Sequence, residues 1–164
     1  MRTGVYFILL LSMLMPVSCS KAWRGDGPPK ILHGSEWIGT NQARGEILDM
    51  VFGLTEDYTR SESEDGSTYE TGDMKVVFSF PVQGESPAGL RDTISYLGTY
   101  QYTRTPSRVH GDVHHGVAEF DLVDSLTGER TSFGMSFHNQ RFFVSFRGSS
   151  YPADRVDEPT AVQQ

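Results

Sequence analysis

The sequence predicts an all-β fold, a single antiparallel meander of about eight to ten strands that closes into a barrel. Apolar side chains recur with period two in one stretch after another, the pattern of strands with one buried face. Asp65-Gly66, Thr71-Gly72-Asp73 and Thr127-Gly128 have the chemistry of tight turns. Closure is favoured because an open meander leaves two exposed edges. A two-sheet β-sandwich is the alternative.

Residues 1–18 have the features of an export signal. Arg2 precedes the apolar run Val5–Val17, and small residues close it. As a helix, this run would reach only about 20 Å, which is short for a hydrocarbon core of about 30 Å. We therefore expect a signal peptide that is removed, rather than a permanent transmembrane helix.

Cys19, the single cysteine of the chain, directly follows this segment. With Leu14 upstream and Val17 and Ser18 before it, Cys19 resembles the end of a bacterial lipobox. In that motif the cysteine is acylated, with palmitate among its chains, and becomes the new N-terminus. Pro16 stands where the motif usually has leucine. The resemblance implies a membrane anchor at Cys19, and the alternative is an ordinary signal peptide cut nearby that leaves a free thiol.

The composition of residues 19–164 limits the partners of the mature chain. The removed segment holds one basic residue, Arg2, and no acidic one, so 13 Lys and Arg remain against 21 Asp and Glu, a balance of −8. This charge excludes nucleic acid as a partner, because phosphate binding needs the opposite sign. A lone cysteine cannot form an intramolecular disulfide, so packing must stabilise the fold. The remaining length suits one domain.

Both ends of the mature chain are predicted to lie outside the folded domain. Residues 19–33 contain the lipidated cysteine and are then rich in Gly, Pro and charge, so we expect a flexible tether. Residues 149–164, SSYPADRVDEPTAVQQ, are expected to form a disordered C-terminal tail. The β-barrel domain is thus assigned to residues 34–148.

Strands are predicted within this domain wherever apolar residues share one parity. The first stretches fall near residues 48–54, 74–82, 94–102 and 118–122. Their positions of shared parity are Leu48, Met50, Phe52, Leu54, Met74, Val76, Phe78, Phe80, Val82, Ile94, Tyr96, Gly98, Tyr100, Tyr102, Ala118, Phe120 and Leu122. The stretch SFGMSFHNQRFFVSF follows, and its two apolar runs around a polar HNQR turn predict a hairpin.

Four motifs follow one another along the domain. They are GSEWIGT at its start, LDMVFGL, the Tyr-x-Tyr strand in GTYQYT, and SFGMSFHNQRFFVSF at its end. Their order resembles that of the small lipocalin-like lipoproteins of Bacteroides-type bacteria. The resemblance implies a lipocalin-like barrel that opens on the strand containing Trp37. It also implies a cell-envelope lipoprotein, periplasmic or surface-exposed, whose barrel holds an apolar ligand.

Three tyrosines are the candidate ligand-binding residues. Tyr96, Tyr100 and Tyr102 lie on one face of a predicted strand, and a phenol combines an apolar body with a hydrogen-bonding tip. Small barrels either enclose one small ligand or fill their interior with such side chains. The alternative is therefore that these tyrosines belong to the core.

The segment VHGDVHHG, residues 109–116, offers a candidate metal site. On one regular strand, His110, Asp112 and His114 would share a face, and two imidazoles with a carboxylate suit zinc. The apolar parity changes within the segment, however, which indicates a bulge or turn that would separate the ligands. Solvated loop histidines are the alternative.

Nothing in the sequence has the pattern of a catalytic site. Gly-x-Ser-x-Gly and spaced metal-binding motifs do not occur, so we expect a protein that is not an enzyme and needs no cofactor. The sequence therefore predicts a membrane-anchored envelope lipoprotein that binds a small apolar or amphipathic molecule. The alternative function is an accessory or scaffold subunit of an envelope protein complex.

Overall fold

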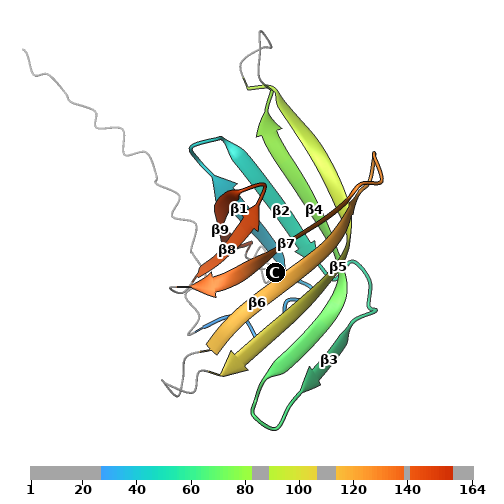
Figure 1. Cartoon of the computed structure of the whole chain (residues 1–164), viewed down its shortest axis with the longest axis vertical. Coiled ribbons are helices and arrows are strands. Elements are labelled where there is room, and N and C mark those ends of the chain that lie inside the picture. The colour runs from blue at the N-terminus through green and yellow to red at the C-terminus, as the bar shows by residue number, and fades with distance from the viewer. Residues whose placement is uncertain (1–26, 83–88, 107–113, 139–140, 157–164) are drawn as a thin grey trace, which may run out of the picture.

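The computed structural model describes residues 27–82, 89–106, 114–138 and 141–156. Within these residues the chain forms nine β-strands and no helix, so none of the described segments is a helix that could span a membrane (Figure 1). The strands are β1 (Glu36–Asn41), β2 (Glu46–Phe52), β3 (Thr59–Glu62), β4 (Thr68–Pro81), β5 (Arg91–Pro106), β6 (His114–Asp124), β7 (Arg130–His138), β8 (Arg141–Phe146) and β9 (Ser149–Arg155). The predicted all-β class is confirmed.

Eight of these strands close into an antiparallel barrel. Successive strands pair with one another except that β2 pairs with β4, and the ring is completed where β9 pairs with β1. In that last pairing, Trp37 lies opposite Arg155 and Gly39 opposite Ala153. The structure is therefore a closed, lipocalin-like barrel rather than a two-sheet sandwich.

The ninth strand, β3, lies outside the ring. It pairs with Thr68–Thr71 at the start of β4, whereas Met74–Ser79 of the same strand pairs with β2. Strands β4 and β5 have 14 and 16 residues, long enough to run past the barrel and carry β3 at the lower end of Figure 1.

The barrel has two different ends. The base is the end where β1 and β4 begin and where β2 and β5 finish, and it lies at the bottom of Figure 1. The mouth is the opposite end, where β1 joins β2, β6 joins β7 and β8 joins β9. Each barrel strand thus runs from one of these ends to the other.

Most of the core consists of side chains with the predicted inward parity. Leu48, Met50 and Phe52 of β2 are completely buried, and Tyr100 of β5 and Leu122 of β6 are buried in the same core. Leu54, which continues the parity in the sequence, lies beyond the end of β2 and is 45% exposed. The pairing of β7 with β8, from Gly134 opposite Ser145 to His138 opposite Arg141, confirms the predicted hairpin.

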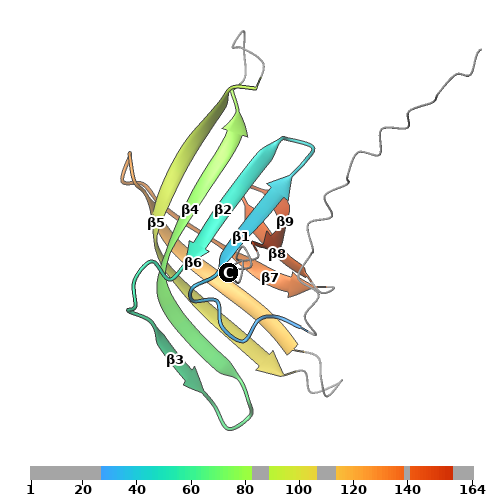
Figure 2. The ribbon, with the colours of Figure 1, turned by 180° about the vertical axis from the view of Figure 1, so that it is seen from behind.

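Both predicted ends of the domain require correction. Residues 149–155 were expected to belong to the tail, but they form β9, because Tyr151 and Ala153 have the inward parity and are buried. Residues 28–33 were expected to belong to the tether, but they cross the base before β1, as the blue segment in Figure 2 shows, with Leu32 fully buried. Residues 1–26 and 157–164 lie outside the described residues.

Gly72 and Gly98 have packing roles that the sequence does not reveal. The sequence predicts a turn at Gly72. Gly72 lies inside β4 instead of in a turn, and a Cβ there would come within 2.9 Å of the Tyr100 ring. Gly98 of β5 faces β6, where a Cβ would lie 2.0 Å from the Asp121 carbonyl oxygen. The bare backbone at Gly98 therefore allows β5 and β6 to approach closely.

We expect Gly98→Ala to lower the free energy of unfolding by about 3 kcal/mol, because backbone atoms of β6 must move to admit the methyl group. Thr99→Ala, at the exposed neighbouring position, is the matched control and should change stability little. Denaturant unfolding measures both. Equal stabilities of the two variants would contradict this account of Gly98.

Candidate functional site

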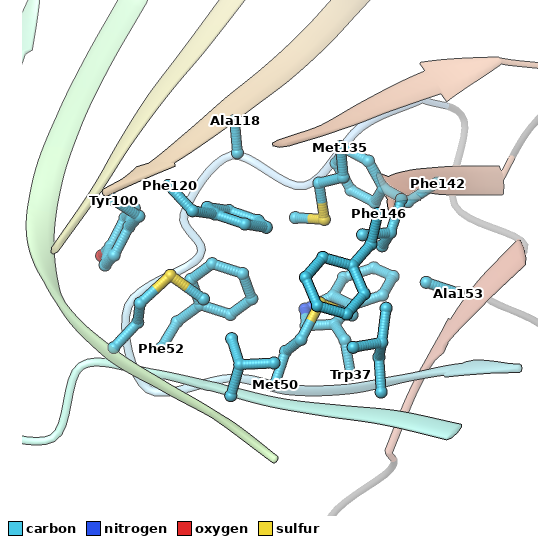
Figure 3. Close-up of a cluster of buried hydrophobic side chains, with 14 of the residues drawn as sticks. Trp37, Met50, Phe52, Tyr100, Ala118, Phe120, Met135, Phe142, Phe146 and Ala153 are labelled. Carbon is cyan, nitrogen blue, oxygen red and sulfur yellow. The ribbon is translucent and has the colours of Figure 1, made fainter. Parts of the chain in front are cut away.

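Aromatic side chains from facing walls of the barrel touch across its interior. Phe78 of β4 and Phe146 of β8, which stand opposite each other in the ring, have ring centroids 5.2 Å apart. Nearer the base, Phe52 contacts Tyr100 at 5.0 Å and Phe120 at 5.7 Å. Figure 3 shows this cluster, with Trp37, Phe142 and Met135 extending it. The described interior is thus packed with side chains.

The base is closed by a segment that we call the strap, residues 28–35. Consecutive prolines at its start limit the backbone and leave no N–H to satisfy. The Tyr102 hydroxyl donates to the Pro29 carbonyl at 2.5 Å, and the Arg104 Nε donates to the Pro28 carbonyl at 3.2 Å. Both donors come from the end of β5, which therefore fixes the first half of the strap.

A buried carboxylate holds the second half of the strap. Glu70 of β4 is only 2% exposed, and its Oε1 accepts hydrogen bonds from the Leu32 N–H at 3.1 Å and the His33 N–H at 2.7 Å. The Tyr100 hydroxyl donates to the same oxygen at 2.7 Å, across the space that Gly72 leaves open. A carboxylate buried among apolar side chains is tolerated only when donors surround it in this way.

Two of the three predicted ligand-binding tyrosines are thus engaged at the base. Burial, followed by the hydrogen bond to Glu70 and its charge, raises the pKa of Tyr100 well above the usual value. Burial also raises the pKa of Tyr102. Both phenols therefore stay protonated at physiological pH and serve as hydrogen-bond donors to the strap and to the carboxylate that holds it.

The third tyrosine, Tyr96, lies at the mouth. Its hydroxyl accepts a hydrogen bond from Nη2 of Arg147 at 3.1 Å. The Arg147 guanidinium carbon lies 5.1 Å from the ring centroid of Phe78 and 5.3 Å from that of Phe146, within the range of cation–π attraction. The exposed Arg147 side chain thus covers the aromatic end of the core.

Three apolar side chains that pack against the core are only partly buried. Phe80, Ile94 and Phe133 pack against the core from β4, β5 and β7 without being fully covered. Phe133 and Phe146 have centroids only 4.5 Å apart. The mouth therefore combines accessible apolar surface with the Arg147 guanidinium and the Tyr96 phenol.

Arg147 occupies a backbone conformation that is unfavourable for its residue type. The β8–β9 turn has two residues, Arg147 with φ of 48° and Gly148 with φ of 71°, between the partners Phe146 and Ser149. Positive φ at both positions is the geometry of a type I′ turn, in which Asn-Gly is preferred. Arginine at the first position costs about 1 kcal/mol in backbone strain, and it places a guanidinium over the mouth.

The candidate metal ligands cannot be placed together. His110 and Asp112 lie outside the described residues, and His114 begins β6 opposite Pro106. Among the described residues, no group of three His, Cys, Asp or Glu side chains is arranged to hold a metal ion. The metal hypothesis therefore stays a prediction from the sequence.

Two hollows lie on the outer surface of the barrel. One, of about 810 Å³, is formed by β1, β8 and β9, where the Arg141–Asp154 ion pair crosses it at 3.1 Å. The other, of about 540 Å³, runs across β5 to β8 over Gly134 and is lined by hydroxyls and by the carboxylates of Glu119 and Asp121. Outward-facing residues such as Ile38, Thr40, Glu119 and Asp121 line these hollows, and the second hollow also borders the core residues Ala118, Phe120 and Met135.

Glu70, Arg147 and the strap are the functional features that sequence reasoning missed. Glu70 occupies an inward position of β4, but this strand was predicted to begin only near Met74. Arg147 and Gly148 lie between Phe146 and the predicted tail, so the sequence does not predict a hairpin turn there. The detectable signal was the alternation of Tyr151 and Ala153, which makes Arg147-Gly148 a two-residue turn.

We expect Glu70→Ala to lower the free energy of unfolding by about 3 to 5 kcal/mol, because three buried or partly buried donors then lose their acceptor. Glu70→Gln, which keeps one carbonyl oxygen, should cost clearly less. Thermal and denaturant unfolding measure the two variants. Hydrogen exchange at Leu32 and His33 should accelerate in Glu70→Ala, and unchanged exchange there would show that the carboxylate does not hold the strap.

Compared with known protein families, with curated proteins and with solved structures, the chain shows no match.

Proposed function

We propose that the protein is a non-enzymatic, lipid-anchored lipoprotein of the bacterial cell envelope that binds a small amphipathic molecule at the mouth of its barrel. The observation that carries the proposal is the arginine at the mouth. A strained turn holds the Arg147 guanidinium over an aromatic surface and beside the Tyr96 hydroxyl. Strain that persists at one polar residue is typical of sites with a function.

The mouth suits an amphipathic ligand better than the interior does. Phe80, Ile94 and Phe133 offer partly exposed apolar surface, whereas the rings below them already fill the barrel. An apolar tail would therefore lie across the mouth rather than enter deeply. The guanidinium, with several N–H donors, is suited to a carboxylate or another acceptor at the head of the ligand.

The position of the strap supports an orientation for an anchored barrel. The described chain begins at Gly27, beside the base, and eight positions separate it from Cys19. An extended segment of that length spans at most about 28 Å. An anchor at Cys19 would thus keep the base near the membrane and leave the mouth free to face away from it.

A second candidate function is an accessory subunit that binds an envelope protein through its outer surface. The hollow across β5 to β8 favours it, because Glu119 and Asp121 project there among hydroxyl groups. A packed barrel also serves well as a rigid support for such a surface. The two functions differ in whether the mouth or the outer wall is used.

Titration of the purified protein with decanoate, followed by calorimetry, tests the mouth. We expect decanoate to bind, and Arg147→Asn to weaken its binding about tenfold through loss of charged hydrogen bonds. Asn is preferred at this turn position, so the variant should be at least as stable as the original protein. Decanol, which lacks the charge, should bind weakly to both.

Arg60→Asn provides the matched control, because Arg60 lies on β3 at the base and should leave decanoate binding unchanged. Equal decanoate affinity of Arg147→Asn and the original protein would contradict a role for the guanidinium. If no amphipath binds, while a polar peptide shifts the amide signals of β6 and β7, the accessory function is favoured instead.

The anchor is tested separately from the ligand. We expect Cys19→Ala to abolish incorporation of labelled palmitate and to release the protein from the membrane fraction, because stable attachment requires the acyl chains. Cys19→Ala should not change decanoate binding. If the variant remains acylated and membrane-bound, the assignment of Cys19 is wrong.

A further inference from the structure

Strand β3 has one free edge. It hydrogen-bonds to β4 on one side, and no described strand pairs with its other side. All four of its residues, Thr59–Glu62, are exposed, and Figure 2 shows the strand at the margin of the molecule, away from the ring. An exposed strand edge is a template for pairing with another strand.

The register with β4 shows which backbone groups point outward. The Ser63 N–H donates to the Ser67 carbonyl at 2.9 Å, so this pair is hydrogen-bonded, and it continues the register of β3 with β4. Hydrogen-bonded and non-hydrogen-bonded pairs alternate in antiparallel ladders. Ser61 is therefore bonded to β4, and the N–H and C=O groups of Arg60 and Glu62 face the free edge.

The two residues with outward backbone groups carry opposite charges. Arg60 and Glu62 are both exposed, and neither forms an ion pair within the described part of the chain. A protective edge commonly carries charge that repels a second copy or blocks pairing. An arginine and a glutamate two positions apart are instead complementary to an antiparallel copy of the same strand.

We propose that two copies of this chain associate through β3, in an antiparallel register centred on Ser61. In this register Arg60 of each copy lies opposite Glu62 of the other. Four backbone hydrogen bonds and two cross-strand ion pairs then join the copies into one continuous sheet. Centring on Arg60 or on Glu62 would instead place like charges opposite each other.

The neighbouring side chains are compatible with this register. Ser61 meets Ser61 of the second copy at a non-hydrogen-bonded pair, where the Cα atoms approach most closely and a small residue fits. Tyr69, paired with Ser61 on β4 and 48% exposed, lies beside these serines. Because β3 is outside the ring, this contact leaves the barrel and its mouth unchanged, and the association does not depend on ligand binding.

Charge exchange tests the association. We expect the purified full-length protein to show concentration-dependent dimers in sedimentation equilibrium. Arg60→Glu should weaken dimerisation about tenfold, because both ion pairs become repulsive. The double variant Arg60→Glu with Glu62→Arg should restore it. Monomers at every concentration would overturn the proposal, as would failure of the double variant to recover while the barrel remains folded by circular dichroism.

Cysteine cross-linking tests the register. We expect Ser61→Cys to form a disulfide-linked dimer on oxidation, because the two Cα atoms lie within disulfide range at the centre of the pair. Thr59→Cys is the matched control. Thr59 lies on the same face as Ser61, but in this register Thr59 of one copy is several residues away from Thr59 of the other. The two cysteines should therefore not cross-link. Equal cross-linking of both variants would overturn the register, and no cross-linking of Ser61→Cys would overturn the pairing.

Discussion

The buried carboxylate of Glu70 is the interaction on which the base of the barrel depends. A charge in this apolar interior needs several donors, and two of them are backbone N–H groups of the strap. The strap depends on Glu70 in turn, because the carboxylate accepts hydrogen bonds from the N–H groups of Leu32 and His33. Gly72 is part of the same arrangement, because only a residue without Cβ lets Tyr100 reach the carboxylate. The strap, β4 and β5 are thus joined by one oxygen atom.

This arrangement gives the barrel an asymmetry that its regular topology does not have. At the base, polar contacts are buried and directed at the chain itself. At the mouth, a charged side chain is exposed and lies on aromatic rings that are only partly covered. The contacts that stabilise the base and the surface proposed for recognition therefore lie at opposite ends of the barrel. Substitutions at one end should then be largely independent of those at the other, because the distance between the ends limits coupling.

Period-two patterning predicted most of the fold, and the reason is physical. Strands such as β2 and β8 have one buried face throughout, so parity alone identifies their core residues. It failed where the inward face is not apolar, as at Glu70 and Thr68, since a buried polar residue looks like a solvent-facing one in the sequence. Closure itself followed from the argument about exposed edges.

The candidate site was less predictable than the fold. The three tyrosines are all inside the barrel, as their parity required, but their parity could not distinguish Tyr96 at the mouth from Tyr100 and Tyr102 at the strap. That distinction depends on where each strand begins along the barrel axis. Arg147 lies in the turn that leads into β9, and β9 is a short strand that contains a proline. The sequence signal for this turn, the alternation of Tyr151 and Ala153, is brief, and the pairing of β9 with β1 and β8 establishes the turn.

The pairing of β1 with β9 has a consequence for how the protein comes to be folded. The first barrel strand cannot complete its hydrogen bonds until the last one is available, so contacts of the highest sequence separation close the ring. Hairpins formed earlier, such as β4 with β5, leave strand edges exposed until then. A chain that is still being synthesised therefore stays open until β9 is available. Folding is completed late, and before closure the exposed strand edges are accessible to proteases and chaperones.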